Sequence, residues 1–231
     1  MNFPNRAISW LATMGGLYVL AGCASVSVPV LDVAKGTFAQ WRSAAAVVEI
    51  PDVPNPAYRF LRVEVQGRPP ALLALGYLDP GPLGEVEVWY SSQREVIRTS
   101  AGRIVGTVGL EVDWRAVRYR NSPPLWNTEM PAEFEFERLR DVMPGYRFDI
   151  RERLVLSRVG AAPPGTLPKR LPHAVAWYVE RVLSPQPLGL PEAVYAVARS
   201  GGKSTVLYSR QCLSEDFCLH LQPWPVPVID P

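Results

Sequence analysis

Cys23 is the residue with the clearest chemistry in this chain, because it ends the stretch Leu20-Ala21-Gly22-Cys23. A single cation, Arg6, and an apolar run over 7–20 precede that stretch. This is the layout of a secretory signal peptide with a small-residue cleavage site. A cysteine directly after such a site is typical of a bacterial lipobox, in which the thiol is acylated and the chain is cut before it. The sequence therefore predicts a signal peptide over residues 1–22 and a lipidated first residue, Cys23, carrying fatty acids such as palmitate.

The apolar run is short for a membrane-spanning helix, which needs roughly 20 apolar residues. Acyl chains stabilise membrane attachment by about 0.8 kcal/mol per buried methylene, and more than one chain makes the attachment stable. We therefore expect lipid rather than a helix to hold the protein at the membrane. A plain signal peptide with an incidental cysteine is the alternative.

The other two cysteines, Cys212 and Cys218, would face an oxidising compartment after export. Their spacing can close a small loop between two strands, so the sequence favours a disulfide, with a reduced pair as the alternative. A metal site is not favoured, because only His220 lies near them among residues of the metal-binding types.

Motifs of catalysis are weak. The two histidines, His173 and His220, accompany no recognisable Ser or Cys nucleophile motif, and no Gly-rich phosphate loop is visible. Glu133, Glu135 and Glu137 share one strand face, and a carboxylate pair could in principle act on glycosidic bonds. Alternation with phenylalanines is more typical of a solvated strand face. We predict no enzymatic activity, no metal and no cofactor.

Five residues are candidates for binding a glycan or a partner protein. Trp89 shares parity with Glu85 and Glu87, so the pattern predicts that it faces outward and could stack on a sugar ring. The other candidates are arginines, whose guanidinium groups could bind the carboxylates of an acidic polymer: Arg115, Arg118, Arg147 and Arg151. Neighbouring acidic residues make cross-strand ion pairing the alternative.

Charge excludes one class of partner. Lys and Arg number 24 against 22 Asp and Glu. Removal of residues 1–22 leaves 231 − 22 = 209 residues and takes away Arg6, so the mature net charge is 23 − 22 = +1. Such a balance provides no attraction of the whole molecule to nucleic acid.

The elements that must position these residues begin with one short helix. Leu31, Phe38 and Trp41 belong to a helical spacing that predicts an amphipathic helix over 31–47, within a lipidated tether of residues 23–50. Prolines at 51, 54 and 56 stop that helix. Residues 51–231 then form a single domain that ends in a Pro-rich tail.

Period-two patterns dominate this domain and predict about ten strands joined by short turns. Glycines mark two of the expected hairpin turns, at Gly102 and at Gly201-Gly202. The alternation of strands and helices that a parallel sheet requires is missing. The predicted fold is all-β, an antiparallel meander partly closed into a barrel, with the one N-terminal helix. The expected strands are 58–66, 71–77, 85–90, 94–99, 103–108, 133–137, 146–156, 173–183, 193–199, 203–209 and 217–221.

Residues 55–110 carry a family resemblance. The stretch contains Asn55-Pro56-Ala57-Tyr58, the strand end Val88-Trp89-Tyr90 and a hairpin, Thr99-Ser100-Ala101-Gly102-Arg103-Ile104-Val105, that leads to Gly109-Leu110. It resembles the group 4 capsule polysaccharide lipoprotein family, the GfcB/YjbF group. The likeness covers most of the mature chain, although the Cys212/Cys218 pair and the Pro-rich stretch 162–172 depart from the family pattern. The resemblance implies an all-β, partly closed barrel and no catalytic residues to carry over.

The resemblance also implies a role beside outer-membrane and periplasmic partners that make or export extracellular polysaccharide. We therefore expect a non-enzymatic accessory lipoprotein that docks an export protein or acidic polysaccharide. Ala24 follows Cys23 where an Asp would resemble an inner-membrane retention signal, so the expected location is the periplasmic face of the outer membrane.

Two other function classes stay open. A lipid or lipoprotein carrier would need an empty apolar cavity, and a glycan-modifying enzyme would need two carboxylates about 5–10 Å apart in a cleft. A docking module could instead have an interior filled by aromatic side chains, for which the sequence offers Phe60, Phe134, Phe136, Phe148 and Trp177.

Overall fold

The computed structural model describes residues 50, 54–126, 131–172, 174–183 and 189–228. The predicted signal peptide, Cys23 and the predicted helix over 31–47 lie outside these residues. No helix that is long and apolar enough to cross a membrane occurs in the described part of the chain.

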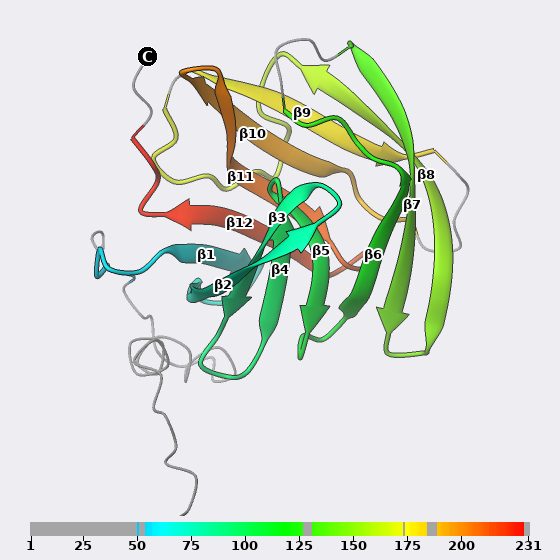
Figure 1. Ribbon diagram of the computed structural model, residues 1–231, viewed down its shortest axis with the longest axis horizontal. Coiled ribbons are helices and arrows are strands. Elements are labelled where there is room, and N and C mark those ends of the chain that lie inside the picture. The colour runs from blue at the N-terminus through cyan, green and yellow to red at the C-terminus, as the bar shows by residue number, and fades with distance from the viewer. Residues whose placement is uncertain (1–49, 51–53, 127–130, 173, 184–188, 229–231) are drawn as a thin grey trace, which may run out of the picture.

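Twelve antiparallel strands in one sheet make up the described residues (Figure 1). Strands that follow one another in the chain pair, except β5 with β6, and β1 also pairs with β12. The sheet order is therefore β5-β4-β3-β2-β1-β12-β11-β10-β9-β8-β7-β6. The all-β meander, nearly closed into a barrel, is therefore confirmed. The strands are β1 (Phe60–Val65), β2 (Ala71–Gly81), β3 (Gly84–Tyr90), β4 (Val96–Ser100), β5 (Arg103–Val108), β6 (Asp113–Asn121), β7 (Glu133–Met143), β8 (Arg147–Val159), β9 (Val175–Val182), β10 (Ala193–Ser200), β11 (Lys203–Cys212) and β12 (Cys218–Trp224).

The barrel nearly closes where β5 meets β6. There the Thr107 hydroxyl accepts a hydrogen bond from the Trp114 backbone N–H at 2.9 Å and bonds to the Asp113 carboxylate at 3.1 Å. Asp113 also accepts the backbone N–H groups of Gly109 and Leu110. These side-chain bonds stand in for a strand ladder at the seam, where no continuous β5–β6 pairing is recorded for the described residues.

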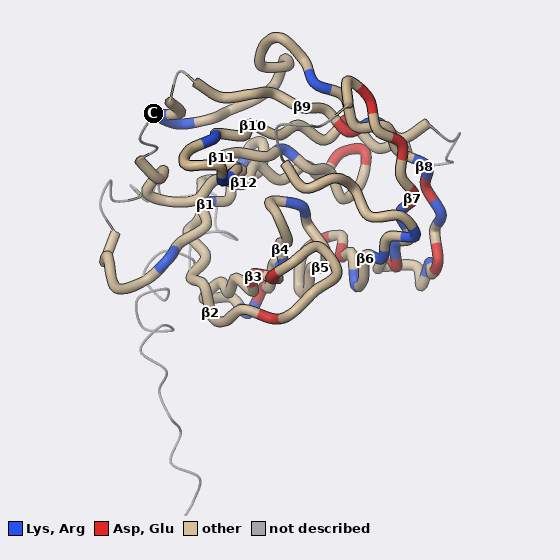
Figure 2. The backbone as a smooth tube through the Cα atoms, turned by 45° about the horizontal axis from the view of Figure 1, so that its top comes forward, with Lys and Arg blue, Asp and Glu red and all other residues tan. Residues whose placement is uncertain are grey.

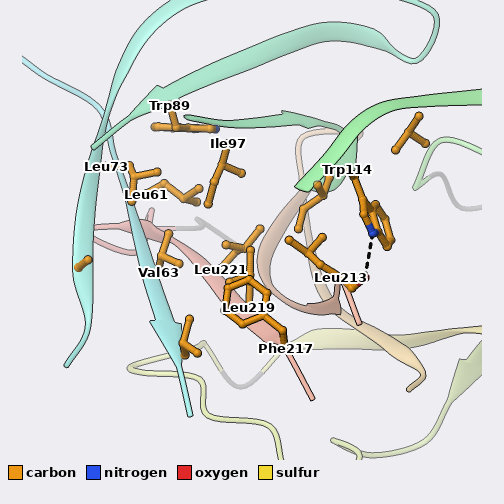
Figure 3. Packing of buried hydrophobic residues seen from close by; sticks show 14 of the residues in the cluster. Leu61, Val63, Leu73, Trp89, Ile97, Trp114, Leu213, Phe217, Leu219 and Leu221 are labelled. Carbon is orange, nitrogen blue, oxygen red and sulfur yellow. Dashed lines mark hydrogen bonds between the residues drawn. The ribbon is translucent and has the colours of Figure 1, made fainter. Parts of the chain in front are cut away.

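Apolar side chains from opposite walls meet inside one half of the barrel. Leu61 and Leu73 from neighbouring strands pack with Trp89, and the Trp114 indole N–H donates to the Leu213 carbonyl at 3.0 Å (Figure 3). Burying such side chains contributes about 1.5–3 kcal/mol each. Members of this cluster, Leu61 and Trp89 among them, also line the open end of the barrel.

The other half of the barrel has an interior of aromatic and charged groups. Phe136, Tyr178 and Tyr195 form a second buried cluster with Trp126. Of the aromatic residues expected inside, Phe136 is buried there and Phe134 packs beside it. The other three are not in this cluster. Phe60 is buried with Leu72 and Trp224 in a separate cluster, Phe148 is 58% exposed on the β7–β8 hairpin, and Trp177 makes an edge contact with Tyr208.

The strand β6 was missed by the sequence pattern. Two irregularities in its pairing with β7, one between Trp114 and Ala116 and one between Tyr119 and Asn121, shift the phase of its side chains. A bulge inserts an extra residue and so breaks the period of two on which strand prediction depends. The arginines at 115, 118 and 120 were consequently interpreted as a charged cluster rather than as part of a strand.

The Pro-rich stretch 162–172 lies over the outer side of the sheet. The Arg210 guanidinium donates to the Pro164 carbonyl at 2.7 Å, and the Gln222 side chain bonds both the N–H and the carbonyl of Lys169. Tyr208 accepts the Leu167 N–H at 3.0 Å. This stretch therefore covers polar side chains of β11 and β12 that the barrel wall directs outward.

Cys212 and Cys218 lie opposite each other at the ends of β11 and β12. The structure joins their sulfur atoms in a disulfide with a Cα–Cα distance of 3.8 Å. The bridge closes the turn that carries Leu213 and Phe217, two members of the apolar cluster.

Candidate binding cleft

Trp89 was expected to face outward, and that expectation is wrong. Its side chain is 2% exposed and packs in the barrel interior (Figure 3). Parity does place it on one face of β3 with Glu85 and Glu87, but that face is the inner one. The two carboxylates lie where the barrel opens to solvent, so polar residues here mark the mouth of the barrel rather than its outside.

A cleft of about 1010 Å³ occupies this mouth. Its walls come from the start of β1, from β3, from the β4–β5 turn, from the β10–β11 hairpin and from the chain after β12. These segments are far apart in sequence, and the barrel brings them to one end. The volume lies at the upper end of the usual range for small-molecule sites, about 300–1,000 Å³.

A chain of polar contacts crosses the inner wall of the cleft. The Trp89 indole N–H donates to the Thr99 hydroxyl at 2.9 Å, and that hydroxyl donates to the Glu87 carboxylate at 3.1 Å. Arg59 closes the chain with an ion pair to the same carboxylate and lies 5.8 Å from the centre of the Trp89 ring. The buried Thr99, itself bonded to Trp89, thus holds Glu87 from the inner side while its carboxylate faces the cleft.

The rim of the cleft adds apolar surface and further charge. Tyr58 is half-buried and meets Phe60 edge-on at 6.4 Å, and Leu125 is 56% exposed. Glu85 and Lys203 are exposed on opposite walls. The cleft therefore combines ring and aliphatic surfaces with hydrogen-bonding groups of both signs.

The β4–β5 turn forms the floor of the cleft and is bonded to the far wall. The Gln211 side chain donates to the Gly102 carbonyl at 2.9 Å and accepts the Ile104 N–H at 2.8 Å, while the Trp126 indole donates to the Ala101 carbonyl at 2.7 Å. Gly102 has a φ of +75°, and a Cβ there would lie 2.6 Å from Val206. Glycine is required at this position both for the turn and for the close approach of β11.

Arg103 lies behind this floor and is 1% exposed. Its Nε donates to Glu180 at 2.7 Å, its guanidinium stacks 4.0 Å from the Trp126 ring, and Tyr195 donates to the same carboxylate at 3.0 Å. Burial by itself would lower the pKa of Arg103, but the Glu180 carboxylate raises it above the usual value. Burial, reinforced by Glu180, raises the pKa of Tyr195. The group supports the floor as a buried ion pair.

A second buried ion cluster lies deeper in the barrel. Glu152 accepts hydrogen bonds from Arg138 at 2.8 Å and from Arg140 at 2.7 Å, and both guanidinium groups stack on Trp114. Burial alone would raise the pKa of Glu152, but Arg138 and Arg140 together lower it. The space beside this cluster is about 10 Å³, so this part of the barrel is filled.

The four arginines predicted to bind ligand do not join Trp89. Arg115, Arg118, Arg147 and Arg151 are exposed on β6 and β8, where charged residues of both signs gather along the strands (Figure 2). Arg118 donates to Asp141 at 2.9 Å and to Asp149 at 2.8 Å.

These hydrogen bonds raise the pKa of the Arg118 guanidinium, and the bond from Arg118 lowers the pKa of Asp141. Neighbouring pairs are Arg120–Glu137 and Arg153–Glu135. The outer face of β6–β8 is therefore a ladder of cross-strand ion pairs, the alternative that the sequence left open.

Sequence reasoning missed Arg59, Glu87 and Thr99 as cleft residues. A signal was present, because Glu85 and Glu87 share the parity of a tryptophan, whereas the alternate positions of the strand include Val86 and Val88. Which face closes onto the barrel interior depends on pairing between distant strands, which one strand's pattern does not contain. In the described residues, no group of three or more His, Cys, Asp and Glu side chains could hold a metal ion.

Comparisons with known proteins agree with this architecture. A family model described as group 4 capsule polysaccharide lipoprotein gfcB, YjbF, matches residues 33–217. The crystal structure of the hypothetical lipoprotein YmcC from Escherichia coli K12 superposes with a TM-score of 0.58 at 18% identity, covering 83% of this chain and 93% of that one. At that identity the likeness shows the fold. No curated protein matches the sequence.

Proposed function

Because the chain belongs to the group 4 capsule polysaccharide lipoprotein family, the GfcB/YjbF group, we propose that it is a non-enzymatic accessory factor in capsule or exopolysaccharide assembly or export. It is a membrane-anchored lipoprotein, and the proposal places it on the periplasmic face of the outer membrane. The lipobox ending at Cys23 and the Ala24 that follows it support this location.

The observation that carries the proposal is the cleft at the barrel mouth. Tyr58, Arg59 and Phe60, which lead the chain into β1, line it. A tether from Cys23 would therefore join the barrel on the side of the cleft. This arrangement suits a protein that holds a polymer or a partner close to a membrane.

The packing beside Trp114 argues against the alternative of a lipid carrier. A carrier needs an enclosed apolar cavity of at least a few hundred Å³. The space enclosed beside Trp114 and Glu180 is about 10 Å³, and charged groups line the barrel there. The large cleft instead lies at the mouth and carries exposed charges, which would be costly to desolvate against an acyl chain.

Catalysis on a glycan is not the activity that we propose, although Glu85 and Glu87 both line the cleft. The Glu87 carboxylate already accepts hydrogen bonds from Arg59 and Thr99, which gives it a binding role in the wall of the cleft.

A pull-down of the mature, lipidated protein from detergent-solubilised envelopes tests the proposed function. A Cys23→Ser variant is the control, because it should leave the barrel intact and lose the membrane attachment. We expect the lipidated protein to recover an outer-membrane or periplasmic export protein, or capsular polysaccharide. Recovery of lipid alone would overturn the proposal in favour of the carrier.

A further inference from the structure

We infer that the cleft at the barrel mouth is a glycan subsite that takes an uncharged, hydroxyl-bearing segment of the polysaccharide. The inference rests on the proposed function and adds the chemistry of the ligand and the residues that bind it. Arg59 and Glu87 would hold the sugar hydroxyls, and the apolar rim would meet the sugar ring.

The Arg59–Glu87 pair offers an acceptor beside a donor. A carboxylate has about four acceptor positions, of which the recorded bonds from Arg59 and Thr99 occupy two. Arg59 has five N–H donors, and its side chain is 58% exposed. Neighbouring hydroxyls of a pyranose both donate and accept hydrogen bonds. An adjacent carboxylate and guanidinium can therefore bind two of them at once.

The carboxylate of this pair is positioned in advance of binding. Thr99 is 3% exposed and Trp89 is 2% exposed, and their hydrogen bonds fix one Glu87 oxygen from the buried side. A ligand that meets a fixed carboxylate does not have to order it, and this reduces the entropic cost of binding.

The rim supplies surfaces that match the C–H faces of a sugar. The half-buried Tyr58, the exposed Leu125 and the exposed Pro225 all line the cleft. A tyrosine combines a flat apolar face with a polar end, which suits a ring that carries both C–H and O–H groups.

The near balance of charge gives an anionic segment little advantage over an uncharged one. The charged residues that line the cleft are three cations and two anions. Arg59 is paired with Glu87, and the exposed Glu85 would repel the carboxylate of a uronic acid. The charged lining residues are Arg59, Arg199, Lys203, Glu85 and Glu87. Binding through hydroxyls predicts an affinity that salt hardly changes, because screening acts on net charges.

Calorimetric titration of the lipidated protein in detergent micelles tests this inference. The probes are oligosaccharides released from the host capsule by mild acid, and the same oligosaccharides after chemical reduction of their carboxyl groups to alcohols. We expect the two forms to bind within about threefold of each other. We also expect each affinity to change less than about twofold between low and high salt.

Two matched variants assign the binding to the cleft. Glu87→Gln should weaken binding about tenfold, because hydrogen bonds to a charged acceptor are roughly twice as strong as neutral ones. Glu135→Gln removes the carboxylate of an exposed Arg–Glu pair on the outer face and should leave binding unchanged. A thermal melt of each variant checks that the fold is intact.

Three results would overturn the inference: loss of binding on carboxyl reduction, equal affinity of Glu87→Gln and the parent protein, or no binding of either probe. The pull-down separates these failures from a failure of the proposed function. An envelope partner recovered by a protein that binds neither probe would leave the accessory role standing and remove the glycan subsite.

Discussion

Charged residues lie on both faces of the same strands, and the two faces use them differently. On the outer face of β6–β8, Arg153 and Glu135 form a pair whose side chains are 58% and 56% exposed. On the inner face of the same strands, Arg140 and Glu152 are 2% and 0% exposed. Exposed pairs are screened by water and salt, whereas a buried charge depends on its partner. The contrast teaches that the strand face, rather than residue type, determines what an arginine does in this barrel.

The largest expected effect is that of breaking the inner cluster. Glu152→Gln leaves Arg138 and Arg140 buried without their carboxylate, so we expect a loss of about 3–5 kcal/mol in the free energy of unfolding. Chemical denaturation of the purified protein measures it. A loss below about 1 kcal/mol would show that the inner and outer charges are energetically alike.

Alkaline pH should also lower the stability of the protein, because a buried tyrosine resists ionisation. Burial raises the pKa of Tyr119 to about 12, against about 10 in an unfolded chain. Between these pH values the unfolded state loses a proton that the folded state keeps, so stability falls as pH rises from 10 to 12, by about 2 kcal/mol. An absorbance titration should show a late phenol step near pH 12. Ionisation of every tyrosine in one step near pH 10 would contradict the expectation.

Two glycines allow a turn packed against a neighbouring strand to be compared with one that is not. Gly102→Ala should destabilise the protein by about 2 kcal/mol, because positive φ disfavours alanine and the new Cβ would meet Val206. Gly201→Ala also has positive φ, but its Cβ would meet nothing within 4 Å, so about 1 kcal/mol is expected. Thermal unfolding of both variants measures the difference. Equal losses would mean that the β4–β5 turn does not pack against β11 as described.

The smallest effect is expected on the outer face. Glu135→Gln removes an exposed ion pair with Arg153 and should change the free energy of unfolding by less than about 0.5 kcal/mol. Chemical denaturation of the variant and the parent protein at low and high salt measures the contribution of the pair and how far salt screens it. A loss comparable to that of Glu152→Gln would remove the distinction between the two faces.

Much of the fold follows from local patterns in the sequence. Even positions along β7 and β8 carry Phe136 and Leu154 inward, and the same parity places Arg138 and Glu152 inside. Residue type alone would assign these charged residues to the surface. Only the pairing of Arg138 and Arg140 with Glu152 makes burial acceptable, and that pairing depends on the register between two strands.

The cleft could be predicted only in part. Trp89 was identified as a candidate, although on the wrong face, and the four candidate arginines lie away from the cleft on β6 and β8. Arg59 and Glu87 meet across a 28-residue separation, and the floor joins Gly102 to Gln211 across 109 residues. Such long-range contacts follow from closure of the sheet, which no single segment specifies.

Complementation of a host strain that lacks this protein tests the central claim, that function lies on the inner face at the barrel mouth. Surface polysaccharide is measured after expression of Glu87→Gln or Glu135→Gln, with immunoblots showing equal amounts of protein in the outer membrane. We expect Glu135→Gln to restore the polysaccharide fully and Glu87→Gln to restore only a small part of it. Full restoration by both variants would contradict the account.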